Sequence, residues 1–158
     1  MFDEWPIVEY DGICLKKVAR EDAPLMEDLF EHPLSGRDCL RMQKAFEIRF
    51  LEHACMVLGI YEAGLFKGVI EAYSIADGYC EIGYRVKPAY QSQGIATRAV
   101  LLMCGLLLRL GMKVKAHCLK DNEASRKVLV ANGFRPTGND GGTEYELCLA
   151  LDDSGEEE

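Results

Sequence analysis

The feature that most constrains the fold is an almost uniformly apolar segment, residues 96–110, that follows a glycine-containing loop. Its spacing predicts a helix, and a helix that is apolar on nearly all sides must be buried against another element. Gly111 directly after it is well placed as the C-terminal glycine of that helix. Tyr79–Val86 before the loop and Lys113–Leu119 after the helix look like strands. This order predicts a crossover connection that leaves the two strands locally parallel.

The other segments place this crossover in an α/β fold. Further strands are expected at Ile13–Ala19, Cys55–Tyr61, Leu65–Ile75 and Thr143–Leu151, and further helices at Glu21–Glu31, Arg37–Glu52 and Asn122–Asn132. We therefore expect a mixed, mostly antiparallel sheet of about 6–7 strands flanked by about 4 helices. It would form a single domain over residues 1–151, followed by an acidic tail at residues 152–158.

Charge narrows the classes of partner. The chain of 158 residues holds 18 basic and 26 acidic side chains, for a net charge of −8, which argues against nucleic acid as the main partner. Residues 1–80 carry a net charge of −7, whereas residues 81–151 carry +4. An acidic half joined to a basic half suits a protein that holds a cationic ligand on one side and an anionic ligand on the other.

The cysteines and the apolar runs indicate the cellular compartment of the protein. The seven cysteines are scattered, odd in number and without a C-x-x-C pair, so we expect neither a disulfide framework nor a metal site. No signal peptide is expected, and the longest apolar run, Ala99–Leu108, is too short to span a bilayer. We therefore expect a cytoplasmic protein that does not act in a membrane.

The loop Gln91–Thr97 (QSQGIAT) carries the first chemical signal. Backbone N–H groups at the start of a helix, together with its dipole, form a cradle for an anion such as a diphosphate. Gly94 would let a ligand approach the backbone, Ala96 is small, and Thr97 adds a hydroxyl. The loop lacks the lysine of a P-loop and the three glycines of a dinucleotide fingerprint. The alternative is a strand-to-helix turn that needs Gly94 for its geometry alone.

The loop and a second motif further along the chain resemble the motifs of one known family. QSQGIA resembles the Q/R-x-x-G-x-G/A signature of the GNAT superfamily of N-acetyltransferases. About thirty residues later, Asn122–Ser125 (NEAS) and Asn132–Phe134 (NGF) resemble that family's N-x-x-S/A helix and G-F turn. The resemblance is nearest to the branch of ribosomal-protein N-terminal acetyltransferases and extends over nearly the whole chain apart from the acidic tail.

The resemblance implies an enzyme that uses acetyl-CoA as cosubstrate. The acetyl group would pass to a primary amine, a protein N-terminus or a small molecule, by direct attack on the thioester, in a monomer or homodimer. The pyrophosphate would be held by backbone amides of the loop residues Gln91, Gln93, Gly94, Ile95, Ala96 and Thr97. The pantetheine arm would bind the end of the preceding strand, at Tyr84, Arg85 and Val86. Asn122 would anchor the cosubstrate near the thioester.

The resemblance also implies catalytic roles for Glu81, Ser125 and Asn122. Glu81 would be the general base that takes a proton from the amine, and a backbone amide, that of Val86, would meet the oxyanion. The alternative for Glu81 is an exposed strand carboxylate or an ion-pair partner. Ser125 would protonate the departing thiolate. Alternatively, Ser125 binds cofactor or packs in its helix, and the thiolate leaves unaided.

Two positions depart from the family pattern. Leu129 stands where many relatives carry a tyrosine that protonates the thiolate, and Arg98 stands where the nearest branch often has glutamate. Leu129 therefore favours an alternative function, a non-catalytic CoA-binding sensor module. His117, near the presumed cleft, is either a proton shuttle or a structural histidine. An α/β domain with no CoA site would require both motifs to be coincidental.

Overall fold

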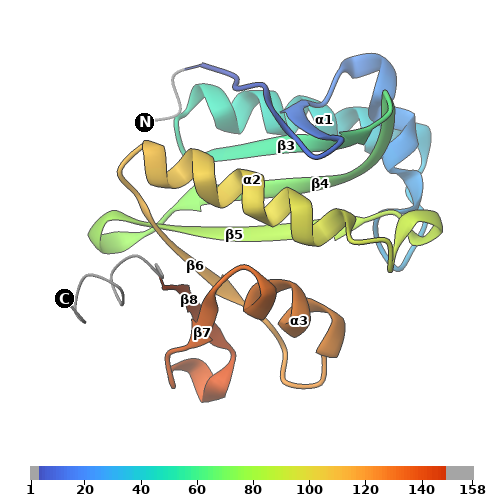
Figure 1. Ribbon diagram of the computed structural model, residues 1–158. Helices are drawn as coiled ribbons and strands as arrows, with labels where there is room; N and C mark the ends of the chain where they lie inside the picture. The colour runs from blue at the N-terminus through green and yellow to red at the C-terminus, as the bar shows by residue number, and fades with distance from the viewer. Residues whose placement is uncertain (1–3, 149–158) are drawn as a thin grey trace.

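The computed structural model describes residues 4–148 and shows one curved sheet with helices on both faces (Figure 1). The strands are β1 Val8–Tyr10, β2 Ile13–Lys17, β3 Cys55–Glu62, β4 Leu65–Ser74, β5 Tyr79–Val86, β6 Lys113–His117, β7 Phe134–Pro136 and β8 Glu144–Leu147. The helices are α1 Gly36–Leu51, α2 Ile95–Arg109 and α3 Glu123–Ala131, with 3-10 helices η1 Arg20–Asp28, η2 Ala76–Gly78, η3 Pro88–Tyr90 and η4 Asp140–Gly142.

The sheet has the strand order β1-β2-β3-β4-β5-β6-β8-β7. Within the described chain, β5 and β6 form the one parallel pair, and α2 connects them, as the predicted crossover requires. The sheet has eight strands, more than the 6–7 expected. The additional strands β1 and β7 are only three residues long, too short to show an alternating pattern in the sequence. The predicted last strand, Thr143–Leu151, is described only as β8; its end and the acidic tail lie outside the described residues.

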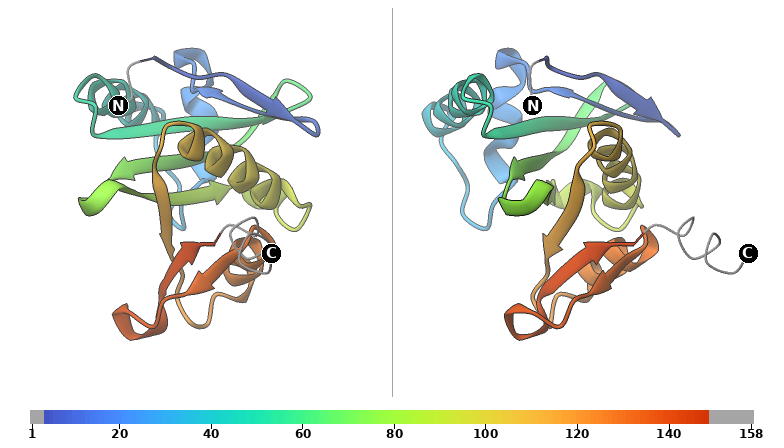
Figure 2. Two further views of the ribbon diagram at one scale, coloured as in Figure 1. Left: turned by 60° about the vertical axis from the view of Figure 1, so that its left-hand side comes forward. Right: turned by 90° about the vertical axis from the view of Figure 1, so that its left-hand side faces the viewer.

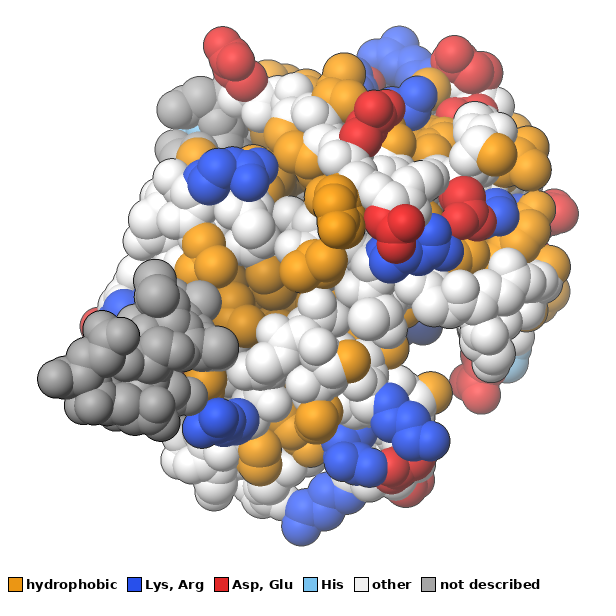
Figure 3. Space-filling model, viewed as in Figure 1, with side chains coloured by type: hydrophobic (Ala, Val, Ile, Leu, Met, Phe, Trp, Pro, Cys, Tyr) orange, Lys and Arg blue, Asp and Glu red, His pale blue; other side chains and the backbone are white. Residues whose placement is uncertain are grey.

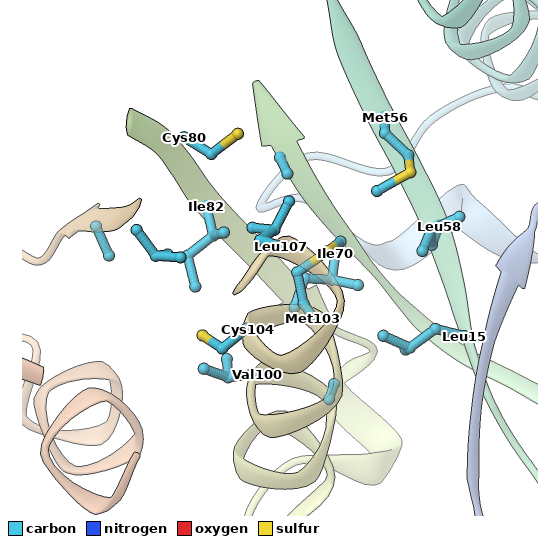
Figure 4. Packing of buried hydrophobic residues seen from close by; sticks show 14 of the residues in the cluster. Leu15, Met56, Leu58, Ile70, Cys80, Ile82, Val100, Met103, Cys104 and Leu107 are labelled. Atoms are coloured by element: carbon cyan, nitrogen blue, oxygen red, sulfur yellow. The ribbon is translucent and has the colours of Figure 1, made fainter. Parts of the chain in front are cut away.

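Helix α2 covers one face of the sheet. Its buried side chains pack between β2 and β5, and Figure 4 shows this contact, in which α2 contributes Val100, Met103, Cys104 and Leu107. Helix α2 is packed on the sheet, as expected, but the described residues leave its outer side uncovered. Leu101 is half exposed and Leu108 is partly exposed, and hydrophobic side chains lie over α2 in the space-filling view (Figure 3).

Helices η1 and α1 cover the opposite face, as the two views of Figure 2 show. Ser35 begins α1 by accepting a hydrogen bond from the Asp38 N–H, and the observed helix agrees with the predicted one to within a residue at each end. The helix expected at Glu21–Glu31 is instead the 3-10 helix η1. Pro24 lies inside it and has no N–H to donate, so a regular α-helical ladder is interrupted there.

Arg98 has a structural explanation. Its guanidinium Nη1 donates to the Asp11 carbonyl at 2.8 Å and lies 3.0 Å from the Glu62 carboxylate. These contacts tie the first turn of α2 to the β1–β2 and β3–β4 turns. A glutamate at this position would face Glu62 with a like charge.

Among the described residues, no helix has both the length and the apolar composition that a membrane span needs.

Gly68 fixes how closely β4 and β5 approach each other at the end of β5. A Cβ on Gly68 would lie 2.3 Å from the Arg85 carbonyl oxygen and 3.0 Å from the Val86 Cα. We expect Gly68→Ala to displace the end of β5 and to lower the free energy of unfolding by about 1–3 kcal/mol, as overpacking does. Urea denaturation measures this loss. Gly36→Ala is the control, because a Cβ there meets nothing within 4 Å; an equal loss in both variants would contradict the prediction.

Candidate active site

The site is built on the point where β5 parts from β6. The parallel ladder runs from the Tyr79–Lys113 pair to the Ile82–Ala116 pair, whereas the pairing of β5 with β4 continues to Val86. The Lys87 N–H donates to the Lys67 carbonyl on the β4 side. Because antiparallel strands alternate the direction of their hydrogen bonds, Tyr84 and Val86 direct their N–H and C=O groups to the open side. Among the described residues, this edge is therefore free of strand pairing where it lines the opening.

A cleft of about 640 Å³ occupies this opening. Its lining residues are Leu29, Tyr84, Arg85, Val86, Tyr90, Gln91, Ser92, Gly94, Ile95, Ala96, Thr97, Asn122, Ala124, Ser125 and Val128. Leu29 directly follows η1 on one face of the sheet, whereas Asn122 and Ser125 belong to the α3 side. The cleft therefore reaches both faces through the gap between the strands.

The N-terminus of α2 forms one wall. Gly94 is the N-cap residue and has a φ of 76°, in the left-handed region that favours glycine. The N–H groups of the first turn, including those of Ile95, Ala96 and Thr97, have no partner within the helix. The Gln91 side chain donates to the Val86 carbonyl at 3.0 Å and so connects this loop to the end of β5. These N–H groups and the helix dipole provide a binding site for an anion.

Helix α3 forms the other wall. The Asn122 side-chain oxygen accepts a hydrogen bond from the Ser125 N–H at 3.1 Å, so Asn122 is the N-cap of α3, and its NH₂ group can donate to a ligand. Asn132 at the other end donates to the Thr97 carbonyl at 3.1 Å and to the Val128 carbonyl at 3.0 Å. The two asparagines of the sequence motifs thus fix α3 and its position beside α2.

A hydroxyl pair lies between the two walls. The Tyr84 hydroxyl is 2.9 Å from the Ser125 Oγ, and both residues line the cleft. Burial raises the pKa of Tyr84, and the hydrogen bond with Ser125 opposes that rise. Leu129, at the position where relatives have tyrosine, is fully buried in the core. Tyr84 from β5 therefore supplies a phenol to the cleft that Leu129 does not.

Glu81 lies on the other face of β5, because side chains alternate along a strand. The Tyr73 hydroxyl on β4 donates to one oxygen of the Glu81 carboxylate. The other oxygen lies 3.1 Å from Nδ1 of His117 at the end of β6. Burial, together with the hydrogen bond between Tyr73 and Glu81, raises the pKa of Tyr73. Glu81 is thus an ion-pair partner as well as a carboxylate beside the opening.

A second carboxylate lies on the same face. Glu71 on β4 pairs in register with Gly83 on β5, and a Cβ on Gly83 would lie 3.2 Å from the Glu71 Oε1. The absence of a side chain at Gly83 leaves room for the Glu71 carboxylate beside the start of the opening. Glu71 and Glu81 together make this side of the sheet favourable for a cation.

Most of the predicted site residues come together. The cleft is lined by Tyr84, Arg85, Val86, Gln91, Gly94, Ile95, Ala96, Thr97, Asn122 and Ser125. Gln93 and Glu81 do not line it. No sequence motif assigns a role to Tyr73 or to the side chain of Tyr84. The Asp77–Gly78 turn between β4 and β5 is the sequence signal that could have found Tyr73, because the register of these two strands pairs Tyr73 with Glu81.

Comparison with known proteins identifies the class. Residues 10–135 match the family model of the acetyltransferase (GNAT) domain, and the chain belongs to this family. The fold, the enzyme class and acetyl-CoA as cosubstrate, all expected from the sequence, are confirmed at the level of the family. A search of curated protein sequences found no match.

Solved structures share the fold at low sequence identity. One is RimL, a ribosomal L7/L12 α-N-protein acetyltransferase in complex with coenzyme A, with a TM-score of 0.76 and 17% identity over 89% of this chain and 95% of that chain. Another is an acetyltransferase from Salmonella typhimurium that modifies the N-terminal serine of L7/L12, with a TM-score of 0.73 and 17% identity over 89% and 96%. A third is the microcin C7 self-immunity acetyltransferase MccE with acetyl-CoA and AMP, with a TM-score of 0.71 and 20% identity over 87% and 91%.

Proposed function

We propose that the protein transfers the acetyl group of acetyl-CoA to a primary amine by direct attack on the thioester. The observation that carries this proposal is the opening between β5 and β6, which joins an anion-binding helix N-terminus to a face that bears Glu71 and Glu81. The diphosphate of acetyl-CoA would bind the first turn of α2. The pantetheine arm would bind the free backbone edge at Tyr84–Val86.

The chemistry assigns a role to each group. The amine enters as a cation from the face that carries Glu71 and Glu81, and Glu81 takes its proton. The N–H of Val86, which points to the open side of β5, stabilises the oxyanion. Ser125, hydrogen-bonded to the Tyr84 hydroxyl, protonates the departing thiolate.

The acceptor is a protein N-terminus or a small amine. Two carboxylates on the acceptor face support a substrate that is cationic in solution. The Salmonella typhimurium acetyltransferase with this fold modifies the N-terminal serine of L7/L12, so a peptide with a free N-terminal serine is the first acceptor to test. We place the reaction in the cytoplasm, as the scattered and unpaired cysteines favour.

Acetyl-CoA should stabilise the protein through the loop at Gly94. At a hundred times its dissociation constant, a ligand stabilises by about 2.7 kcal/mol, which at this length raises the thermal midpoint by several degrees. We expect Gly94→Ala to reduce that shift, because alanine is strained at the φ of 76°. The control Gly64→Ala has similar strain in the β3–β4 turn, at a φ of 77°. If both variants keep the full shift, the loop does not hold the cosubstrate.

Glu81→Gln separates an enzyme from a CoA-binding sensor. We expect this variant to keep the acetyl-CoA-induced thermal shift and to lose turnover by roughly 100- to 10,000-fold, because an amide cannot accept the proton. Mass spectrometry of the acetylated peptide measures turnover. Glu71→Gln is the comparison variant and should raise KM for the amine more than it lowers kcat. Unchanged turnover in Glu81→Gln would refute Glu81 as the base, and no turnover in the unmodified protein with any amine would favour the sensor.

The hydroxyl pair should act as one unit. We expect Ser125→Ala and Tyr84→Phe each to lower kcat by about tenfold, less than many general acids contribute because a CoA thiolate leaves readily. The double variant should be little worse than either single variant. Tyr79→Phe on the same strand, which loses a hydrogen bond to Glu146, should keep kcat. Multiplying losses in the double variant would show two independent roles.

A further inference from the structure

His117 has a carboxylate at each ring nitrogen. Its Nδ1 lies 3.1 Å from the Glu81 Oε1, and its Nε2 lies 2.7 Å from the Asp140 Oδ2. Glu81 belongs to β5, His117 ends β6, and Asp140 begins η4, so the fold brings three distant segments into one line. We name these three residues the Glu81–His117–Asp140 chain.

The ring of His117 links the protonation of its two neighbours. A neutral imidazole has one N–H and one bare nitrogen, whereas two ionised carboxylates both require a donor. With the proton on Nε2 and donated to Asp140, the bare Nδ1 faces the Glu81 oxygen and can accept a proton from it. A proton that arrives on Glu81 can therefore pass to His117 through this contact.

Exposure increases along this chain. The exposed fraction of the side chain is 18% for Glu81, 38% for His117 and 59% for Asp140. A proton on Glu81 thus has a hydrogen-bonded route from a partly buried carboxylate to groups in contact with water. The fourth member of the network, Tyr73, has a raised pKa and remains a donor to Glu81, so it offers no exit.

We propose that His117 and Asp140 are positioning residues that carry the proton of the acceptor ammonium from Glu81 to solvent. This inference rests on the proposed function, in which Glu81 is the base. The ammonium N–H bond breaks as the Glu81 O–H bond forms, and the proton then passes to Nδ1 of His117. Glu81 is again a carboxylate, and the imidazolium held by Asp140 gives one proton to water. The free amine then attacks the thioester. No group is oxidised or reduced in these steps.

The direction of the pH dependence follows from the neighbours of His117. The hydrogen bond to Asp140, and then the charge of Glu81, raise the pKa of His117. The other groups near it are Glu144 on β8, Lys115 on its own strand and, through Glu81, Tyr73 on β4. An imidazolium cannot accept a second proton, so turnover must fall as the pH falls through the pKa of His117. Removal of the Asp140 charge lowers that pKa and moves this acidic limb to lower pH.

Two measurements test the Glu81–His117–Asp140 chain on the full-length protein. The protein contains three histidines, so NMR titration of the imidazole signals resolves His117 once His117→Gln has assigned its signal. We expect Asp140→Asn and Glu81→Gln each to lower the pKa of His117. Asp140→Asn is a conservative test, because the side chain is exposed and asparagine tolerates its φ of 52°. The control His32→Gln, which removes an exposed histidine, should leave the His117 titration in place.

The second measurement is the pH profile of kcat/KM with the N-terminal-serine peptide. We expect Asp140→Asn to shift the acidic limb to lower pH, and His117→Gln to lose about tenfold of the plateau, a fraction of what proton transfer contributes. Unmoved limbs in both variants, with Glu81→Gln inactive, would overturn the proton path and leave the proposed function intact. An active Glu81→Gln would overturn both. If the peptide is not acetylated, the NMR titration decides alone. A pKa of His117 that is unchanged in Glu81→Gln and in Asp140→Asn would overturn the Glu81–His117–Asp140 chain.

A bound metal is the competing explanation of this cluster. Ligand atoms of His117, Asp140 and Glu144 lie within 4.8 Å of one another. Lys115 Nζ lies 3.8 Å from the Glu144 carboxylate, and Thr137 and Asn139 donate hydrogen bonds to the same carboxylate. These contacts already neutralise and occupy Glu144, so it is a poor ligand for a cation. Dialysis against EDTA should therefore leave turnover and the His117 titration unchanged. A loss that Zn²⁺ restores would overturn the proton path in favour of a metal site.

Discussion

The separation of β5 from β6 beyond Ile82 is the constraint on which the site depends. Up to Ile82 the two strands share a parallel ladder, and from Gly83 on β5 is paired with β4 and no longer with β6. The free backbone edge can exist because the cleft lies beside it and α2 begins at its end, where Gln91 holds the Val86 carbonyl. A continuous ladder would fill the opening and leave the α2 N-terminus without access to the opposite face.

The alternation of side chains along β5 divides the chemistry between the two faces. Tyr84 points to the α3 side, where it meets Ser125, whereas Glu81 points to the other side, where it meets Tyr73 and His117. The proposed base and the proposed acid therefore act on opposite sides of the same opening. In the proposed reaction, the amine and the cosubstrate would therefore approach from different faces.

Sequence reasoning located the cosubstrate side of the site better than the acceptor side. The loop, the helix that follows it and the N-x-x-S motif are contiguous segments, and seven of their predicted residues line the cleft. The acceptor side depends on pairings between distant strands. Glu81 was predicted, but its partners Tyr73, His117 and Asp140 meet only because β4, β6 and η4 come together around it. The sequence alone favours a structural role for His117 over a proton shuttle.

By itself, the sequence determined the α/β order, the crossover through α2 and the glycine loop that opens α2, because these follow from local periodicity, glycine conformation and helix ends. Only the tertiary structure decided that β5 diverges from β6 and that Tyr84 supplies the hydroxyl absent at Leu129. It also decided which carboxylates surround His117. Strand register and the approach of remote loops depend on how the whole core packs, and no local stretch of residues encodes that packing.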